Sequence, residues 1–126
     1  MKGEPDESGP LELDLYGLRV SVQSNWVDVI AALRRDFGWF ERVDPAGSPQ
    51  VRVQIERKAP DYDLLGEASA SFVTPRNVVF HHDGRTIVDY FGQAVSVLEP
   101  ALGNLSVQGR SSHLVHEAVY LFLLSR

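Results

Sequence analysis

The chain of 126 residues contains no cysteine, which excludes disulfide bonds, zinc–thiolate sites, iron–sulfur clusters and cysteine nucleophiles. Lysine is almost as scarce, because only Lys2 and Lys58 occur. The sequence has no Gly-x-x-x-x-Gly-Lys-Ser/Thr phosphate loop, no Gly-x-Gly-x-x-Gly fingerprint and no Gly-x-Ser-x-Gly nucleophile elbow. We therefore expect no cofactor in this chain, and we name no catalytic, cofactor-binding or metal-binding residue.

Positive charge and long apolar runs are lacking as well. The chain has 17 acidic and 12 basic residues and a net charge of −5, which argues against nucleic-acid partners and anionic membranes. No apolar run approaches the roughly 20 residues needed to cross a bilayer. The first ten residues also lack the apolar segment of a signal peptide. These absences predict a cytoplasmic protein with no nucleic-acid or membrane partner.

What is present is the composition of one ordinary globular domain. Apolar residues make up 44% of the chain and charged residues 23%. Residues 1–10 are mostly glycine, proline and acidic side chains, which predicts a disordered tail. Residues 11–126 are long enough for a single domain with its own core, and we expect this domain to be the N-terminal part of a longer protein.

Alternating apolar and polar side chains predict several strands. Asp83-Gly84 gives the strongest hairpin signal, and Gly92-Gln93 predicts a second turn. Residues 58–70 form a polar connection without a clear period, and residues 104–108 fit either a strand or a loop. The predicted strands cover residues 11–16, 18–23, 51–57, 78–82, 85–91 and 94–98, with a short one at 72–74.

An apolar stripe with helical spacing predicts a helix over residues 26–37. Asn25 is in position to cap this helix, with Asp28 at the capping-box position, and Gly38 is a typical C-terminal stop. The stripe consists of Trp26, Val29, Ile30, Leu33 and Phe37.

A second helix is predicted over about residues 112–125, with Ser112 as its N-cap. Nine of the eleven residues from Leu114 to Leu124 are apolar, so apolar side chains cover nearly its whole circumference. A helix packed on one face of a sheet needs an apolar stripe only about 100° wide. We therefore expect this helix to continue into, or to be covered by, something else, unless it lies between two sheets of its own fold.

Together these patterns predict the α+β class, with a mainly antiparallel sheet of about five to seven strands and two principal helices, about 26–37 and 112–125. Helix 26–37 is expected on one face of the sheet, and the C-terminal helix on the same or the opposite face. The predicted core is Leu13, Leu15, Val20, Val22, Trp26, Val29, Ile30, Leu33, Phe37, Val53, Ile55, Phe80, Ile87, Val88, Phe91, Val95, Val97, Val119, Phe122 and Leu123.

Three groups of polar residues are candidate sites. His113, His116 and Glu117 share one helix, but their spacing is not that of zinc peptidases, and we interpret them as a polar first turn. His81-His82 alternate across a strand, so their rings point to opposite faces. Residues 61–67 begin like a calcium loop, but Phe72 stands where the bidentate glutamate belongs, which favours an acidic surface loop.

The residues also resemble a known family. Tyr16-Gly17-Leu18-Arg19-Val20 and, above all, the helix His116-Glu117-Ala118-Val119-Tyr120-Leu121-Phe122-Leu123-Leu124-Ser125-Arg126 are similar to the N-terminal region of HPr kinase-like (HPr kinase-related) bacterial proteins. The resemblance extends over most of residues 11–126. In that family the His-Glu-Ala-x-Tyr helix leads directly into a nucleotide-binding domain with a phosphate loop. ATP and magnesium are implied only for such a kinase domain.

The resemblance implies a non-catalytic accessory domain that positions a following kinase domain or binds its protein or peptide substrate. A freestanding domain that homodimerises through the C-terminal helix is one alternative. A small enzyme or ligand-binding protein that uses His113, His116 and Glu117, or the acidic residues of 61–67, is another. The expected interaction surface consists of Val115, Val119, Phe122, Leu123 and Ser125.

Overall fold

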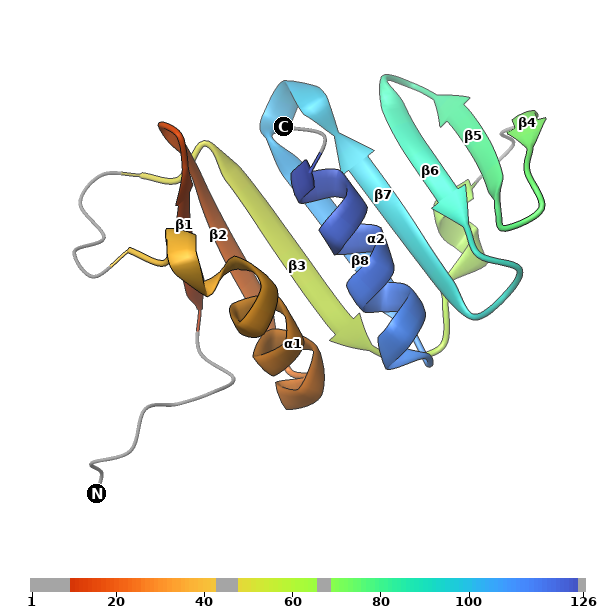
Figure 1. Ribbon diagram of the computed structural model, residues 1–126. Coiled ribbons are helices and arrows are strands. Elements are labelled where there is room, and N and C mark those ends of the chain that lie inside the picture. The colour runs from red at the N-terminus through yellow and green to blue at the C-terminus, as the bar shows by residue number, and fades with distance from the viewer. Residues whose placement is uncertain (1–9, 43–47, 66–68, 125–126) are drawn as a thin grey trace.

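The computed structural model describes residues 10–42, 48–65 and 69–124, which form one mixed β-sheet with two α-helices (Figure 1). This arrangement confirms the predicted α+β class. The sheet has eight strands in the described part of the chain, more than the five to seven expected. The predicted tail, residues 1–10, lies outside the described residues except for Pro10.

The strands follow the order β1-β2-β3-β8-β7-β6-β5-β4 across the sheet. Five of the seven neighbouring pairs are antiparallel, and β3 runs parallel to both of its neighbours. The strands are β1 (Leu11–Leu15), β2 (Leu18–Ser24), β3 (Val51–Arg57), β4 (Ala70–Val73), β5 (Val78–His82), β6 (Arg85–Asp89), β7 (Ala94–Glu99) and β8 (Asn104–Gly109). The helices are α1 (Val27–Phe37) and α2 (Ser112–Leu124), with short 3-10 turns η1 (Gly38–Phe40), η2 (Tyr62–Leu65) and η3 (Pro100–Leu102).

Local turn chemistry explains the hairpins. Asp83 and Gly84 have φ angles of 52° and 74° and join β5 to β6, as the Asp-Gly pair predicted. Tyr16 and Gly17 have φ angles of 55° and 98° and join β1 to β2. Positive φ at both central residues matches the right-handed twist of the flanking strands, so both turns favour tight antiparallel pairing.

Long-range pairing decides the centre of the sheet. β2, α1 and β3 form a strand–helix–strand crossover, which lets β2 and β3 pair in parallel (Figure 1). β8 pairs with β3 on one side and with β7 on the other. Residues 104–109 are therefore a strand, which the sequence had left open.

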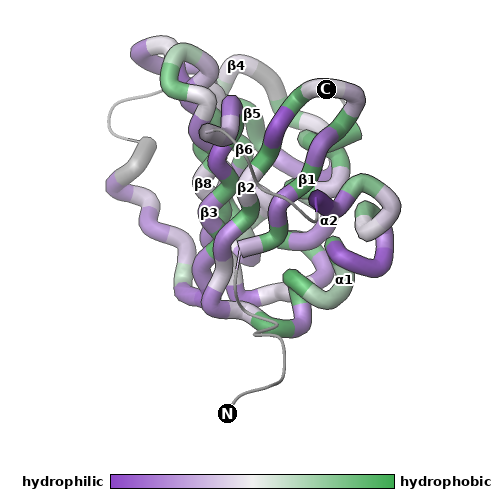
Figure 2. Tube along the Cα trace, turned by 90° about the vertical axis from the view of Figure 1, so that its left-hand side faces the viewer, coloured by the Kyte–Doolittle hydropathy of each residue, from purple (hydrophilic) through white to green (hydrophobic). Residues whose placement is uncertain are grey.

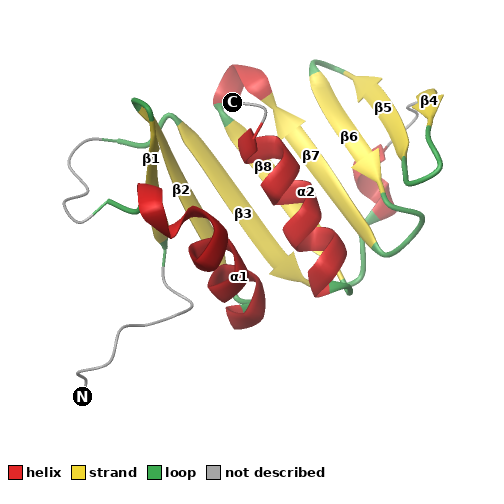
Figure 3. Cartoon of the chain, in the orientation of Figure 1, coloured by secondary structure: helices red, strands yellow, loops and turns green. Residues whose placement is uncertain are grey.

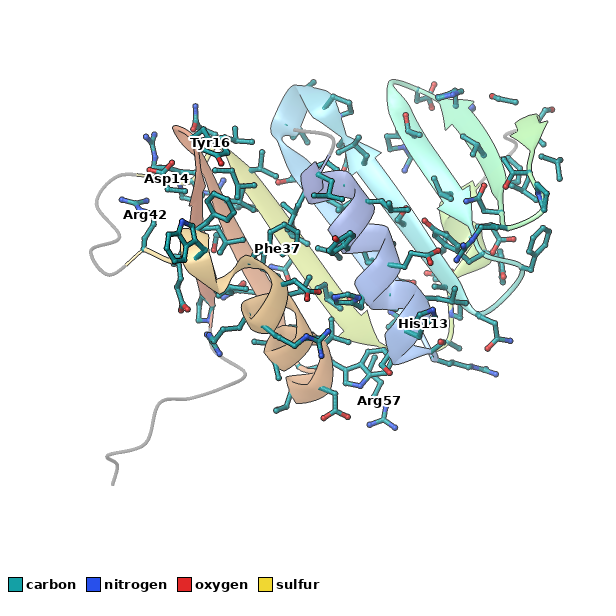
Figure 4. The ribbon with its side chains drawn as sticks, in the orientation of Figure 1. Asp14, Tyr16, Phe37, Arg42, Arg57 and His113 are labelled. Atoms are coloured by element: carbon teal, nitrogen blue, oxygen red, sulfur yellow. The ribbon has the colours of Figure 1, made fainter. Side chains whose placement is uncertain are left out.

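Both helices lie on the same face of the sheet (Figures 2 and 3). α1 contacts β1 and β2, whereas α2 contacts β7 and β8. The two helices also touch each other, since the ring centroids of Phe37 and Tyr120 lie 5.5 Å apart. Figure 4 shows Phe37 between the two helices. The main core beneath the helices includes Leu11, Leu13, Val20, Val22, Ile30, Leu33, Val53, Ile55, Leu105 and Val107.

The opposite face of the sheet has a smaller apolar cluster of Ile87, Val95 and Val97, with Phe80 packed against it. The connection between β3 and β4 is tied down on this side. The Asp61 amide donates to the Gln108 side chain (3.0 Å), and the Tyr62 hydroxyl donates to Asp89 (3.1 Å). The polar segment that lacked a period is thus held by hydrogen bonds.

Four local predictions are wrong. Ser112 is the first residue of α2 rather than its N-cap, because the Ser111 hydroxyl accepts the backbone amide of Leu114. The N-cap of α1 is Trp26 rather than Asn25, because the Asn25 side chain accepts the backbone amide of Arg57 instead. Gly38 does not stop the helix in a left-handed conformation, since its φ of −59° carries the chain into η1. Phe91 is 54% exposed rather than in the core, because β6 ends two residues earlier and Phe91 lies in a turn with φ 52°.

Candidate functional site: the apolar surface around the C-terminal helix

The inner side of α2 is fixed by packing on the sheet. Val115 and Val119 are completely buried and Leu123 is 3% exposed, all within the core of this chain. Phe122 is half-buried, and Ser125 lies outside the described residues. Among the four described residues of the predicted interaction surface, Phe122 alone is partly accessible.

The outer side of α2 remains apolar at its C-terminal half. Leu121 is 52% exposed and Leu124 is 60% exposed. Residues three apart lie on the same face of a helix, so the two leucines form one exposed stripe. From Ala118 to Leu124 the helix has no charged side chain. This stripe is the surplus of apolar surface that the sequence predicted.

A groove runs along one side of α2, between the helix and strands β6 and β7. Its volume is about 220 Å³. Val88 and Leu98 are half-buried, and Leu121 and Phe122 of α2 complete the apolar wall. We call it the side groove; its lining is Thr86, Val88, Tyr90, Ser96, Leu98, Leu105, Ala118, Leu121 and Phe122, none of which is charged at neutral pH.

Tyr90 lies at the polar end of the side groove. Its side chain is 7% exposed, and burial raises the pKa of its hydroxyl above the ordinary value, with Glu117 acting in the same direction. Beyond it, an ion pair joins Arg76 to Glu117 and links the β4–β5 connection to α2. The charges at this end are thus already paired within the chain.

A second pocket, of about 400 Å³, lies at the C-terminal end of α2. Figure 1 places this end of the helix beside the connection between β7 and β8. That connection carries Leu102, which is 64% exposed. We call Leu102, Leu124 and this pocket the end patch; the pocket is lined by Leu18, Gln50, Val51, Leu98, Pro100, Gly103 and Phe122.

The residues considered as a metal site do not converge. His116 pairs with Asp36 of α1 (Nε2 to Oδ2, 2.7 Å), and Glu117 pairs with Arg76. His113 is exposed on the first turn of α2 (Figure 4). Among the described residues, no group of three or more His, Asp or Glu side chains could hold a metal ion.

The pair between His116 and Asp36 joins the two helices electrostatically. Burial acts to raise the pKa of Asp36, but hydrogen bonds from His116 and Arg35, together with their charges, outweigh it and lower the pKa below its usual value. Asp36 is therefore held in its charged form at neutral pH. Its contact with His116 links α1 to α2.

The other two groups are also dispersed. His82 lies 3.2 Å from Asp83, while the His81 ring contacts the Thr86 hydroxyl at 3.3 Å. In the acidic loop, the Asp61 carboxylate accepts the Asp63 amide. Glu67 and Gly66 lie outside the described residues.

Sequence reasoning missed the sheet side of the side groove. The sequence pattern predicts Val88 in the core and does not distinguish Leu98 from its neighbours. The strand register brings them together, because Val88 pairs with Ser96 and Thr86 pairs with Leu98. The alternation along residues 85–89 could have indicated which of these residues share a face, but not that α2 leaves them partly exposed.

Comparison with protein-family models, with curated proteins and with solved structures gave no match to this chain. Among the described helices, none has the length and apolar character needed to cross a membrane. A function for the chain therefore has to follow from its own surface.

Proposed function

We propose that this chain is a non-catalytic interaction domain of an HPr kinase-like protein, and that it positions a following nucleotide-binding kinase domain or the protein substrate of that domain. The observation that carries the proposal is the end patch, where Leu102 and Leu124 are each at least 60% exposed beside an apolar pocket. Contiguous apolar surface rimmed by polar residues is characteristic of protein interfaces.

The position of the end patch suits a partner that follows in the same chain. In the family that the sequence resembles, the helix corresponding to α2 leads directly into the kinase domain. A domain attached there lies next to Leu124 and Leu102 without a long connection. ATP and magnesium would belong to that domain.

The energetic case rests on the two leucines. Full burial of a leucine side chain contributes about 1.5–3 kcal/mol relative to leaving it in water. Leu102 and Leu124 already lose part of their exposure in the isolated chain, so each can contribute about 1–2 kcal/mol on docking. A contact that already has a covalent link needs little additional affinity.

The first test is the gene downstream of the codon for Arg126. The proposal expects a glycine-rich phosphate loop in the encoded continuation, and a natural stop at this position would contradict a kinase domain in cis.

The second test uses the longer protein. Leu124→Asp and Leu102→Asp should loosen the contact between the two domains, measured as increased hydrogen exchange in η3 and at the C-terminal turn of α2. The matched control is Val27→Asp, because Val27 is 43% exposed and lies in the first turn of α1, where an acidic residue is favourable. Equal exchange in all variants and in the wild type would refute the end patch as the contact.

A further inference from the structure

Three cationic side chains gather at one edge of the sheet. β2, β3 and β8 run parallel to one another, so their carboxyl ends share this edge. Arg57, the last residue of β3, pairs in register with Gly109, the last residue of β8, and the Lys58 amide donates to the Gly109 carbonyl oxygen at 3.1 Å. Arg110 follows directly, and Figure 4 shows Arg57 at the lower edge of the view. We call Arg57, Lys58 and Arg110, all of them exposed, the basic edge.

The basic edge has no anionic partner among the described residues. The guanidinium of Arg57 lies over the Trp26 ring, 5.3 Å from its centroid, which holds the side chain in place without neutralising its charge. None of the three cations forms an ion pair in the described part of the chain, whereas three other arginines do. Glu56 and Asp61 are close in sequence but do not pair with them, and Asp61 accepts the Asp63 amide instead. The basic edge can therefore still accept carboxylates.

The chain itself carries a segment of matching charge. Residues 1–9 contain Glu4, Asp6 and Glu7 but only one basic residue, Lys2, so three negative side chains and one positive one give a charge of −2. The segment has no aromatic or branched aliphatic side chain. Charge, rather than burial of apolar surface, is therefore what this segment can use to bind.

The segment joins the sheet within reach of the basic edge. β1 begins at Leu11, which the register sets level with Val53 of β3, two strands away. Arg57 lies four residues further along β3, about 13 Å along the strand and about 10 Å across two strand spacings, or about 16 Å from Leu11 in all. Asp6 and Glu4 precede Leu11 by five and seven residues, which an extended chain converts to about 17 and 23 Å. Both carboxylates can therefore reach the basic edge of their own chain.

We propose that Glu4, Asp6 and Glu7 dock on the basic edge of the same chain, so that the N-terminal segment crosses the carboxyl ends of β2 and β3. Each contact needs little affinity, because a short covalent link gives a high effective concentration. The docked segment shields the three cations and competes with any acidic partner from solution. The proposal does not rest on the proposed function, because the basic edge lies at the start of α2 and the end patch at its C-terminal end.

Zero-length crosslinking with a carbodiimide tests the contact, because it joins a carboxylate directly to an amine. The chain has only two lysines, and Lys2 belongs to the segment itself, so Lys58 is the only lysine of the basic edge. Mass spectrometry of the full chain should find residues 4–7 crosslinked to Lys58 within one chain at low salt. Arg57→Gln combined with Arg110→Gln keeps both reacting groups and should lower the initial rate by about 10-fold, since each exposed ion pair contributes up to a factor of about 5.

The matched control is Arg52→Gln combined with Arg85→Gln, which changes the net charge equally but leaves the basic edge intact. Its crosslinking rate should equal that of the wild type, and circular dichroism of both double variants controls for folding. Equal decreases in the two double variants would overturn the proposal, because the site of the charge would then not matter. It would also be overturned if residues 4–7 formed no crosslink with Lys58, or formed one only between two chains, which would identify a second copy as the partner.

Nuclear magnetic resonance gives a second readout without chemical modification. Glu4→Gln, Asp6→Asn and Glu7→Gln together keep the link but remove its negative charge. The backbone amide signals of the basic edge should then shift, whereas those of Asp83-Gly84 in the β5–β6 turn should not. About 1 M salt should move the wild-type signals in the same direction, because it shortens the screening length to about 3 Å. Unchanged signals of the basic edge in the neutral variant would contradict the docking.

Discussion

The two sides of α2 should respond very differently to the same substitution. Leu121 and Leu123 are two residues apart on one helix, yet Leu121 is 52% exposed and Leu123 is 3% exposed. Leu→Ala at each position changes helix propensity equally, because the same residue type is replaced by the same residue in the same helix. The difference between the two variants therefore isolates burial.

The expected magnitudes follow from that burial. Leu123→Ala removes buried methyl groups and leaves a cavity beneath α2, which costs about 2–4 kcal/mol of unfolding free energy. Leu121→Ala removes side-chain atoms that are half in water, and its cost should stay below about 1 kcal/mol. Chemical denaturation followed by circular dichroism measures both values in one experiment.

Protein concentration is the necessary control, because any association through the exposed side of α2 would bury Leu121. The measurement belongs at the lowest concentration that circular dichroism allows, where the single chain dominates. There, equal losses of stability for the two variants would refute the described orientation of α2. A larger cost for Leu121→Ala than for Leu123→Ala would mean that the helix is rotated on the sheet.

Three further substitutions test local features of the fold by thermal or chemical denaturation. Gly103→Ala should destabilise the chain by more than about 2 kcal/mol, because Gly103 has φ 66° and an added Cβ would collide with the Gln50 carbonyl oxygen; an unchanged stability would contradict this close approach. Tyr16→Asn should stabilise it by about 0.5–1 kcal/mol, since asparagine tolerates the left-handed conformation better than tyrosine, and any destabilisation would show that the tyrosine ring contributes more than its backbone costs. The lowered pKa of Asp36 stabilises the folded chain at pH values above the ordinary pKa of 3.8. This stability is lost as the pH falls through the lower pKa that Asp36 has in the folded chain. Asp36→Asn should therefore lose less stability than the wild type between about pH 4 and pH 2, and parallel curves would show that Asp36 does not contribute.

Much of the fold could be predicted because local signals decide it. Asp83-Gly84 defines a hairpin from turn chemistry alone, and the stripe from Val29 to Phe37 defines a helix from its period. The boundaries agree to within one or two residues, which is the usual uncertainty of helix ends.

The local predictions that failed concern residues whose structure depends on distant parts of the chain. Asn25 is a good N-cap by type, but its side chain accepts the Arg57 amide, 32 residues away in sequence. Residues 104–109 become a strand only because β3 and β7 lie on either side. The number of strands was therefore underestimated where pairing over long distances decides the structure.

The site was predictable in kind but not in position. Nine apolar residues between Leu114 and Leu124 predicted surplus apolar surface, and Leu121 and Leu124 are that surplus. A helix that is apolar all round has no preferred side, so the sequence could not indicate that Val115 and Val119 face the sheet. The groove beside the helix requires the register of β6 and β7, which is a property of the sheet.

The proposed function requires that Leu124, the outward leucine at the C-terminal end of α2, is covered when the protein is assembled. The reactivity of a single thiol at position 124 towards a soluble reagent measures this directly, because the chain has no other cysteine. Leu124→Cys should react more slowly in the longer protein than in the isolated chain. Fast, unchanged reaction of this thiol in both proteins would show that the apolar end of α2 stays in water, and would contradict its role as an interface.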